Sequence, residues 1–345
     1  MTLKVLTVLA GAPVGGAETF FVSLSRALER AGLDVQSLVK PNAAREAALA
    51  EEDIPHRTAP FGGPFDFTTA SKLRKMTEAF KPDVVLAFAG RAASFARPGE
   101  HVLIGRLGGY YNLKNFKHCD YLVCNAPDLV RYCVAGGWPK QRVVLIPNFP
   151  SVPDAPKVER AGVGTPEDAP LAVALGRLHP AKGFDILIQA AALIPDLHVW
   201  IAGEGLERAR LEALVLKLKL KERVKFLGWR EDRAGLFKTA DVCVYPSRTE
   251  PFGNVVVEAW SCGAPLVTTA SVGPKWLVKD GEDAILTPVD DAEKLAAGIK
   301  KVISSPALQI KLAAQGHKRV TEEFSESAIV GRYIKLFEKV TGRSR

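Results

Sequence analysis

The stretch 245–265, YPSRTEPFGNVVVEAWSCGAP, contains the turn around which the predicted fold is organised. An apolar run at 241–245 leads into it and predicts a buried strand, after which Pro251 and Gly253 interrupt any regular pattern. Residues 254–262 predict a helix, which a glycine and a proline then end. The first amides of such a helix have no internal partners and lie at its positive end, so this strand-loop-helix unit favours an anion.

Two carboxylates flank this predicted anion site. Glu250 lies in the loop, and Glu258 lies in the helix eight residues later. At about 100° per residue that interval does not stack two side chains on one helix face, but a bent loop removes the conflict. Carboxylates suit sugar hydroxyls better than phosphate because they accept hydrogen bonds. The alternative is a pair of solvated surface glutamates.

Composition indicates an ordinary soluble globular protein. The 345 residues are 47% hydrophobic and 24% charged, and they suffice for two domains with separate cores. No apolar run approaches the roughly 20 residues needed to span a bilayer, and the five cysteines show neither CxxC nor paired histidine spacing. We therefore expect a reduced, cytoplasmic protein without structural zinc. The net charge of +8 suits a polyanionic partner but is also common in proteins that bind none.

Short apolar runs alternate with helical patterns through both halves of the chain. This order predicts an α/β fold with two doubly wound, Rossmann-like domains, each with a parallel sheet covered on both faces. Residues 147–170, rich in proline, glycine and charge, are the best linker candidate. We place the N-terminal domain at 1–150, the C-terminal domain at 151–324 and a last helix within 325–345. The expected strands are 3–9, 34–39, 84–88, 102–106, 121–124, 143–146, 171–175, 197–202, 224–227, 241–245 and 266–269. The clearest helical patterns are 17–31, 72–80, 184–193, 206–219, 254–262 and 325–340.

Glycine-rich turns follow several of these strands. Gly15 and Gly16 lie between a strand and a helix, where missing side chains let the backbone approach a phosphate or a sugar. Gly203 opens a similar turn in the second half. The loop 176–183, GRLHPAKG, adds Arg177 with its planar fork of donors and Lys182 with its point charge, and together they suit a pyrophosphate. Structural turns and solvated surface cations are the alternatives.

These motifs resemble those of a known enzyme family. Glu250 and Glu258, inside TEPFGNVVVEAWSCGAPLV, are similar to the Glu-x7-Glu signature of retaining glycosyltransferases of the GT-B fold, glycosyltransferase family 4 (group 1). The loop 176–183 is similar to the diphosphate-binding loop of that family. The resemblance is strong over 171–290 and weaker over 1–150. It implies that the two domains face a cleft, that the first binds the acceptor, and that the last helix packs back on the first domain.

The resemblance also implies a role for each matching residue. Glu258 is expected to bind ribose hydroxyls and Glu250 the donor sugar, while Arg177 and Lys182 hold the diphosphate. Glu250, Arg177 and Lys182 are the candidate catalytic residues, because positioning and stabilisation of the leaving diphosphate would supply the catalysis. Glu250 is not assigned as a nucleophile, and no cofactor or metal is expected. The candidate donor-binding residues are Gly15, Gly16, Arg177, Lys182, Gly203, Glu250, Phe252, Gly253, Asn254 and Glu258.

Three positions depart from the family pattern. Lys275 stands where an acidic residue is usual, and Phe149 stands where a glycine is usual. Arg106 occupies the position at which many members have a histidine near the donor sugar. We therefore name Arg106 and the later His118 as candidates for the acceptor or sugar side. The alternative for His118 is a residue that caps a strand.

Basic residues gather in two segments of the first domain, 72–81 (KLRKMTEAFK) and 114–117. In relatives with lipid-linked acceptors, such a surface contacts the anionic inner face of the cytoplasmic membrane. A solvated basic helix face is the alternative.

We predict a retaining, metal-independent glycosyltransferase that moves a sugar from a nucleotide-diphosphate sugar to a hydroxyl of a glycan or glycolipid acceptor. Family analogy places it in lipopolysaccharide or other cell-envelope glycan synthesis. UDP, GDP and ADP sugars all remain open. One alternative is a nucleotide-sugar epimerase or hydrolase of the same fold. The other is a non-catalytic sugar-nucleotide or nucleic-acid binder, although we expect no nucleic-acid partner.

Overall fold

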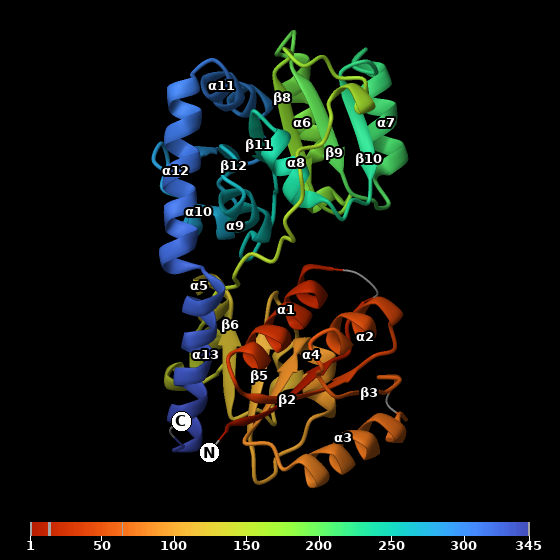
Figure 1. Cartoon of the computed structure of the whole chain (residues 1–345), viewed down its shortest axis with the longest axis vertical. Helices are drawn as coiled ribbons and strands as arrows, with labels where there is room; N and C mark the ends of the chain where they lie inside the picture. The colour runs from red at the N-terminus through yellow and green to blue at the C-terminus, as the bar shows by residue number, and fades with distance from the viewer. Residues whose placement is uncertain (1, 13–14, 64, 344–345) are drawn as a thin grey trace. The chain divides into compact units, whose positions relative to one another are not determined.

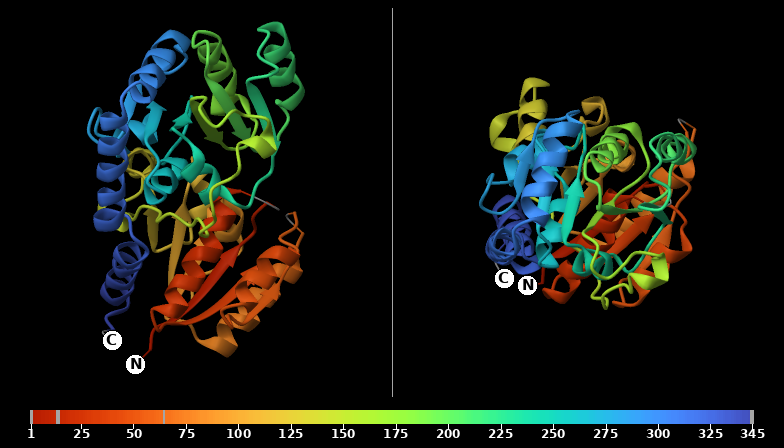
Figure 2. Two further views of the ribbon diagram at one scale, coloured as in Figure 1. Left: turned by 45° about the horizontal axis from the view of Figure 1, so that its top comes forward. Right: turned by 90° about the horizontal axis from the view of Figure 1, so that it is seen from above.

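The computed structural model describes residues 2–12, 15–63 and 65–343, and the chain forms two compact units (Figure 1). Unit 1 consists of Met1–Ser151 with Glu326–Arg345, and unit 2 consists of Val152–Ser325. The domain boundaries expected from the sequence lie one residue before these. Both units are parallel α/β sheets with helices on both faces (Figure 2), so the predicted fold class is confirmed.

The sheet of unit 1 has seven strands in the order β3-β2-β1-β4-β5-β6-β7, and all are parallel. Its central strands are almost fully buried because helices cover both faces. The strands are β1 Lys4–Leu9, β2 Asp34–Val39, β3 His56–Thr58, β4 Val84–Phe88, β5 Val102–Leu107, β6 Tyr121–Cys124 and β7 Val143–Leu145. The helices are α1 Gly16–Arg30, α2 Ala43–Ala50, α3 Phe67–Phe80, α4 Ala89–Phe95, α5 Pro127–Ala135 and α13 Glu326–Thr341, with short 3-10 turns η1 Leu113–Phe116 and η2 Lys140–Arg142.

The last helix, α13, completes the core of unit 1. Its inner residues Tyr333 and Phe337 are 0% exposed and belong to the same apolar cluster as Phe21 of α1. At the start of this helix, Glu326 forms an ion pair with Arg30 at 2.8 Å. Apolar spacing of three and four residues along 326–341 gives this helix one buried face, which needs the sheet of unit 1 to cover it.

The sheet of unit 2 has six parallel strands in the order β10-β9-β8-β11-β12-β13. One apolar core joins α6, α7 and α11 to one face of this sheet. The strands are β8 Leu171–Leu175, β9 His198–Ala202, β10 Val224–Gly228, β11 Val242–Tyr245, β12 Leu266–Thr269 and β13 Ile285–Thr287. The helices are α6 Phe184–Ala192, α7 Arg208–Lys217, α8 Arg233–Thr239, α9 Asn254–Ser261, α10 Val272–Leu277, α11 Ala292–Ile303 and α12 Pro306–Glu323, with 3-10 turns η3 Ala161–Val163 and η4 Pro180–Lys182.

Much of the predicted linker is anchored on unit 2 rather than free. Arg160 donates to the Ala169 carbonyl at 2.8 Å and to Asp241 Oδ2 at 3.0 Å. The backbone N of Val158 donates to Thr239 Oγ1 at 2.8 Å. Proline, glycine and charge therefore mark an irregular segment that packs through hydrogen bonds, where composition alone indicates a flexible tether.

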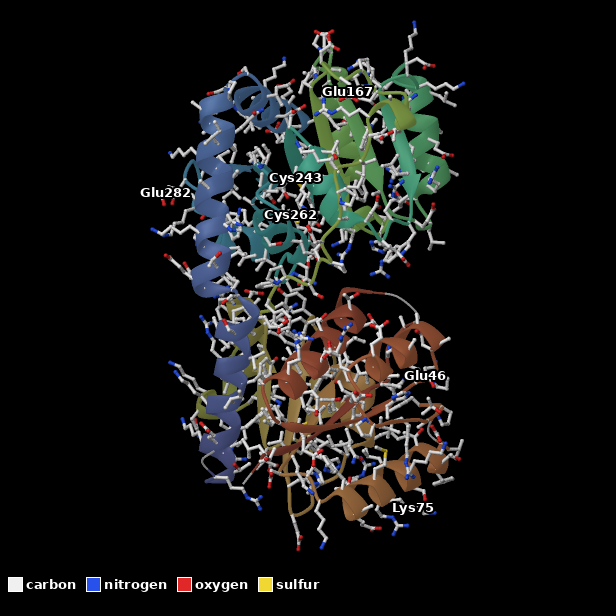
Figure 3. The ribbon with its side chains drawn as sticks, in the orientation of Figure 1. Glu46, Lys75, Glu167, Cys243, Cys262 and Glu282 are labelled. Carbon is white, nitrogen blue, oxygen red and sulfur yellow. The ribbon has the colours of Figure 1, made fainter. Side chains whose placement is uncertain are left out.

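The five cysteines form no disulfide. Cys243 is buried in β11, and Cys262 is half-buried at the end of α9 (Figure 3). No helix in the described part of the chain has both the length and the apolar character needed to cross a bilayer.

Phe337→Ala is expected to destabilise unit 1, because its ring is fully buried in the apolar core of this unit. A cavity of this kind typically lowers the free energy of unfolding by about 3–5 kcal/mol. Urea unfolding followed by circular dichroism measures the change. The matched control is Lys339→Ala on the exposed side of α13, with an expected effect within about 0.5 kcal/mol. Similar losses in the two variants would show that α13 does not depend on this packing.

Candidate active site

The sheet of unit 2 reverses its strand order between β8 and β11. β8 pairs with β9 on one side and with β11 on the other, and the later strands extend the sheet outwards from both. The loops that follow β8 and β11, 176–183 and 246–253, therefore leave the same carboxyl edge. In open parallel sheets, this reversal point is where ligands bind. The predicted anion-binding residues lie in these two loops.

Backbone contacts hold the two loops against each other. The Ala181 carbonyl accepts hydrogen bonds from the backbone N of Arg248 at 2.8 Å and from Ser247 Oγ at 3.2 Å. Gly183 has a φ of +66°, and a Cβ added to it would overlap the carbonyl oxygen of Pro246. Only glycine permits this approach, so the sequence at 183 fixes the separation of the loops.

Lys182, Tyr245 and Glu250 form one hydrogen-bonded cluster across these loops. Lys182 Nζ donates to Glu250 Oε2 at 2.5 Å and to the Tyr245 hydroxyl at 3.1 Å. The Tyr245 hydroxyl donates to the same Oε2 at 2.6 Å. The side chains of Lys182 and Glu250 are 22% and 17% exposed. Two residues that the sequence analysis selected 68 positions apart are thus in direct contact.

The electrostatics of this cluster keep the lysine charged. Burial alone lowers the pKa of Lys182, but the neighbouring Tyr245 and Glu250 more than offset this, and the pKa is raised. Burial raises the pKa of Tyr245, and Glu250 raises it further while Lys182 opposes the rise. The site therefore holds a protonated lysine and a neutral tyrosine at physiological pH. A fixed cation of this kind can bind a phosphate group.

Glu258 lies on α9 and is paired with an arginine from α8. One guanidinium nitrogen of Arg233 donates to both carboxylate oxygens at 2.9 Å. Glu258 is 7% exposed, and burial raises its pKa while Arg233 opposes the rise. The charge of Lys182 also opposes it, which places both predicted carboxylates within electrostatic range of this one lysine. Each carboxylate oxygen retains acceptor capacity beyond its bond to Arg233.

The turn after β9 packs on the loop that contains Arg177. Gly203 has a φ of +148°, and a Cβ there would overlap the carbonyl oxygen of Gly176. The backbone N of Leu178 donates to the Glu204 carbonyl at 2.9 Å. Gly203 therefore has a structural reason to be glycine, and the predicted contact with a donor stays a prediction. Arg177 is exposed at this edge of the sheet.

The start of α9 is fixed by α10. The backbone N of Gly273 donates to the Glu250 carbonyl at 2.8 Å. Phe252 is 1% exposed, and its ring centre lies 6.2 Å from that of Trp276. The side chain of Phe252 is thus committed to packing, which leaves its backbone as the part that could contact a ligand. α9 begins at Asn254, so the positive end of its dipole lies at the same edge.

The predicted glycine turn of unit 1 contains a carboxylate that the sequence analysis did not select. Gly15 caps α1 and Gly16 is its first residue, after β1 and next to the strand-order reversal of the first sheet. Glu18, in the first turn of α1, folds back so that its Oε1 accepts a hydrogen bond from Ala12 N at 2.8 Å. A Cβ added to Gly15 would overlap the other oxygen of Glu18. A carboxylate in this position favours hydroxyl groups and disfavours phosphate, so of the two ligands expected here the sugar fits better.

Arg106 is part of the core of unit 1. It is 2% exposed, and its guanidinium carbon lies 4.4 Å from the ring centre of Phe20 and 5.2 Å from that of Phe88. Its Nη2 donates to Asn148 Oδ1, and its Nε has no hydrogen-bond partner in the part of the chain described. In this conformation the guanidinium is packed against two aromatic rings, and the expected place on the acceptor or sugar side stays a prediction.

His118 lies at the opposite edge of the same sheet from Arg106. It precedes β6, and the backbone N of Asp120 donates to the Leu103 carbonyl near the start of β5. Because β5 and β6 are parallel, both amino ends lie at one edge, whereas Arg106 lies at the carboxyl end of β5. Burial lowers the pKa of His118, and the cations Arg97 and Lys117 lower it further. The structure does not bring Arg106 and His118 together. The position of His118 just before β6 agrees with the alternative given for it, a residue that caps a strand.

Three residues of these sites were missed by the sequence analysis. The sequence pattern predicts Tyr245 only as the last residue of a strand. The role of its hydroxyl is seen only in the structure, where it contacts Lys182 and Glu250. Arg233 lies 25 residues before Glu258, and no local motif links them. Glu18 could have been selected from the sequence, since a carboxylate two residues after a glycine pair can accept a hydrogen bond from a backbone amide of the turn.

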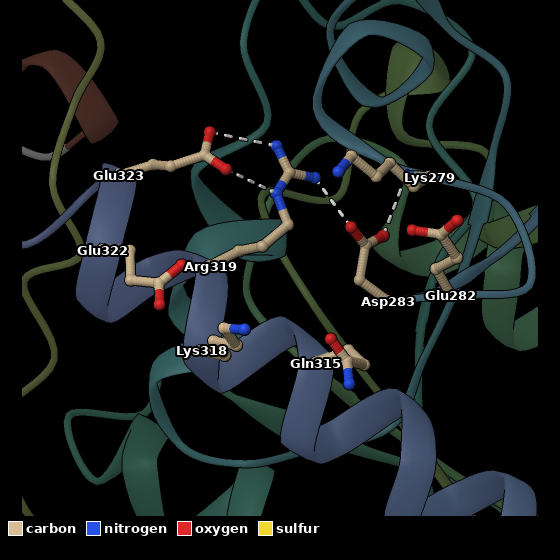
Figure 4. A pocket seen from close by; sticks show the side chains of 8 residues that line it. All are labelled: Lys279, Glu282, Asp283, Gln315, Lys318, Arg319, Glu322 and Glu323. Carbon is tan, nitrogen blue, oxygen red and sulfur yellow. Dashed lines mark hydrogen bonds and ion pairs between the residues drawn. The ribbon is translucent and has the colours of Figure 1, made fainter.

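The opposite edge of unit 2 contains a charged surface hollow of about 130 Å³ (Figure 4). Arg319 of α12 donates to Asp283 Oδ2 at 2.7 Å, and the Asp283 side chain is 1% exposed. The loop with Asp283 precedes β13, so this hollow is remote from the carboxyl edge. The ion pair between Arg319 and Asp283 holds α12 against the loop that precedes β13. Neither here nor elsewhere among the residues described do three or more His, Cys, Asp or Glu side chains form a group that could hold a metal ion.

Gly183→Ala tests the contact between the two loops. The control is Gly164→Ala, because Gly164 has a similar φ of +69° but nothing within 4 Å of an added Cβ. The control should lose about 1–2 kcal/mol from left-handed strain. Gly183→Ala should lose roughly 1–3 kcal/mol more through overlap, and should also lose stabilisation by nucleotide. Urea unfolding with and without ligand measures both effects, and equal losses in the two variants would rule out the close contact.

Comparison with known proteins covers both units. Residues 14–150 match the family model described as Glycosyltransferase Family 4, and residues 157–319 match the one described as Glycosyl transferases group 1. The lipopolysaccharide core biosynthesis glycosyltransferases LpsE and LpsD of Rhizobium meliloti (strain 1021) are each 34% identical. The match covers 93% of this chain and 95% of LpsE, and 94% of this chain and 95% of LpsD. The crystal structure of Anabaena Alr3699/HepE in complex with UDP and glucose gives a TM-score of 0.84 at 22% identity, over 98% of this chain and 100% of that one.

The structural likeness is to GT-B glycosyltransferases, and the sequence likeness extends over nearly the whole chain. The family and fold predicted from the sequence are therefore confirmed. This chain belongs to the group 1 glycosyltransferases of glycosyltransferase family 4.

Proposed function

We propose that this glycosyltransferase moves a sugar from a nucleotide-diphosphate sugar to a hydroxyl of a lipopolysaccharide-core or related cell-envelope acceptor, with retention and without a metal. The observation that carries the proposal is the cluster of Lys182, Tyr245 and Glu250 at the reversal point of unit 2. The names of LpsE and LpsD support the acceptor class. The complex of Alr3699/HepE with UDP-glucose supports a nucleotide-sugar donor. The assignment of acceptor recognition to unit 1 stays a prediction.

Donor binding would exchange one set of partners for another. In the structure, Lys182 and Glu250 satisfy each other in a largely buried ion pair. A diphosphate would compete for Lys182, assisted by the exposed Arg177 and the first amides of α9. Glu250 would then be released to accept hydrogen bonds from hydroxyls of the donor sugar. Binding would therefore require both the diphosphate and the sugar, because either group alone would leave the charge of Lys182 or Glu250 without a partner.

Glu258 suits the nucleoside part of the donor. Arg233 holds the carboxylate in place, and the remaining acceptor sites of its oxygens match a pair of ribose hydroxyls. A phosphate at this position would meet a buried negative charge. Glu258 therefore orients the donor so that its diphosphate lies toward Lys182.

The transfer step can be written with the residues of this chain. The bond between sugar C1 and the diphosphate oxygen breaks, and its electron pair leaves with the nucleotide diphosphate. The acceptor oxygen bonds to C1 on the same face, and its proton passes to an oxygen of the departing phosphate. Lys182, Arg177 and the amides of α9 stabilise the negative charge that develops on the leaving group. Glu250 positions the sugar and forms no covalent bond, so retention results from attack on the face of departure.

A donor is expected to raise the melting temperature of the wild-type protein and to leave that of Glu258→Gln unchanged. At a concentration of 100 times Kd, a ligand that binds only the folded state adds about 2.7 kcal/mol of stability. A thermal-shift panel of UDP-, GDP- and ADP-sugars measures this and identifies the base. The control is Glu222→Gln, whose side chain is 88% exposed and which should respond like wild type. Stabilisation by no nucleotide up to millimolar concentration would contradict the donor site.

Lys182→Ala is expected to lower kcat/KM by roughly 10²–10³-fold, because it removes a cation that stabilises the leaving group. The assay uses the donor from the panel and a deacylated lipopolysaccharide-core oligosaccharide as acceptor. The matched control is Lys225→Ala, a lysine of the same unit that is 27% exposed and paired with Glu222, with an expected rate near wild type.

The product of the same assay tests the stereochemistry and the metal requirement. The proton NMR coupling at the new anomeric centre should match that of the donor, and EDTA should leave the rate unchanged. An inverted product would refute retention, and loss of rate in EDTA would refute metal independence. Release of free sugar at the same rate without acceptor would favour a hydrolase.

A further inference from the structure

Tyr245 is a buried residue of the candidate active site to which the transfer step gives no role. It is the last residue of β11 and is 2% exposed. Its backbone carbonyl accepts a hydrogen bond from Thr268 Oγ1 at 3.0 Å, and β12 pairs with β11 at the same residue. Lys182 Nζ lies 5.3 Å from the centre of its ring. The hydroxyl therefore occupies a fixed place inside the protein, where its partners are protein side chains.

The two hydrogen bonds of this hydroxyl differ in direction. A tyrosine hydroxyl has one proton to donate, and its oxygen can also accept. The proton goes to Glu250 Oε2 at 2.6 Å, a distance typical of a hydroxyl that donates to a charged oxygen. The oxygen accepts from Lys182 Nζ at 3.1 Å. Movement of the lysine would therefore remove the longer bond and leave the bond to the carboxylate in place.

Tyr245 would also keep its proton when the lysine moves. Burial raises the pKa of Tyr245, and Glu250 raises it further, whereas Lys182 opposes the rise. A diphosphate that drew Lys182 away would weaken this opposition. The hydroxyl would thus remain a neutral donor to Glu250 at physiological pH.

The two carboxylates of the site differ in how they are held. Arg233 donates to both oxygens of Glu258 at 2.9 Å, and the proposed donor leaves this pair intact. Glu250 is bonded to Lys182 through Oε2 at 2.5 Å, and the diphosphate would compete for that lysine. Within the described ranges, Tyr245 is the other side chain that bonds Glu250, and Oε1 accepts no hydrogen bond. Tyr245 is thus the protein partner that would stay on Glu250 in the complex.

We propose that Tyr245 is a positioning residue, which holds Glu250 in place for the donor sugar when the diphosphate takes Lys182. This inference rests on the proposed function and adds to it a residue that acts through Glu250 without contacting the substrates. The bond from Tyr245 would satisfy Oε2 and leave Oε1 to accept from the sugar hydroxyls. A neutral hydroxyl suits this role because a second cation would itself compete for the diphosphate.

Tyr245→Phe tests the role because it removes the hydroxyl and keeps the ring at the end of β11. Isothermal titration calorimetry on the full chain measures Kd for UDP-glucose, or for the GDP- or ADP-sugar that the thermal-shift panel selects. In the free variant Lys182 still bonds Glu250 Oε2, whereas in the complex this oxygen would be buried without a partner. Tyr245→Phe should therefore raise Kd by about ten- to one-hundred-fold.

A double-mutant cycle shows whether Tyr245 acts through Glu250. Glu250→Ala removes the carboxylate and leaves Lys182 for the diphosphate, so the nucleotide part of the donor should still bind. In this background Tyr245→Phe should change Kd by less than about two-fold, because the hydroxyl has no carboxylate to hold. A tyrosine that merely packs the end of β11 would cause the same loss in both backgrounds.

The matched control is Tyr132→Phe in unit 1. The Tyr132 hydroxyl donates to the Tyr111 carbonyl at 2.9 Å, so this variant also loses a tyrosine hydrogen bond but none of unit 2. Its Kd for the same nucleotide sugar should stay within about two-fold of the wild-type value. Thermal melting without ligand shows that each variant is folded.

Two results would overturn the proposal and leave the donor site in place. One is a wild-type Kd in Tyr245→Phe. The other is an equal loss on Tyr245→Phe in the wild-type and Glu250→Ala backgrounds. Absence of nucleotide-sugar binding to wild type would instead contradict the proposed function, and this inference with it.

Discussion

The close approach of two backbones, at Gly183 and at Pro246, is the constraint on which the candidate active site of unit 2 depends. These residues follow β8 and β11, which are neighbours in the sheet although about 70 residues separate them in the chain. The Ala181 carbonyl further fixes the positions of the two loops by accepting three hydrogen bonds from the second loop. Only with this separation can Lys182 on one loop bond Glu250 on the other. The chemistry of the site thus follows from packing of the backbone.

The charges of the site are mutually satisfied in a way that favours selective binding. Each predicted carboxylate forms an ion pair: Glu250 with Lys182, and Glu258 with Arg233. Neither buried negative charge is therefore uncompensated. An anion that bound Lys182 alone would leave Glu250 buried and unpaired, which is costly. A ligand with both a diphosphate and sugar hydroxyls repairs this loss. Free phosphate would not, so under the proposed function the ion pair would discriminate in favour of the complete donor.

The parts of the fold predictable from sequence are those that local chemistry determines. β4 and β8 match their expected ranges because continuous apolar runs bounded by turns form buried strands in a sheet covered on both faces. α2 and the three-residue strand β3 were not expected, since α2 buries only two residues and β3 none. Lys182 and Glu250, which have motifs, were selected from the sequence and lie in contact. Their partner Tyr245, and Arg233 beside Glu258, were not selected, because a contact across 25 or 63 residues exists only after the chain has folded.

Arg106 shows how a residue at a family position can also serve the packing of the core. A histidine there could be small enough to face a ligand, whereas an arginine must place a longer side chain and a permanent charge. In this chain the guanidinium stacks on Phe20 and Phe88 and bonds Asn148, and it opposes the rise in the pKa of Tyr333 that burial causes. Since Tyr333 belongs to α13, the arginine at 106 and the last helix pack in the same part of the core. A histidine at 106 would leave that space unfilled, so restoring the family residue alone should cost stability before it affects chemistry.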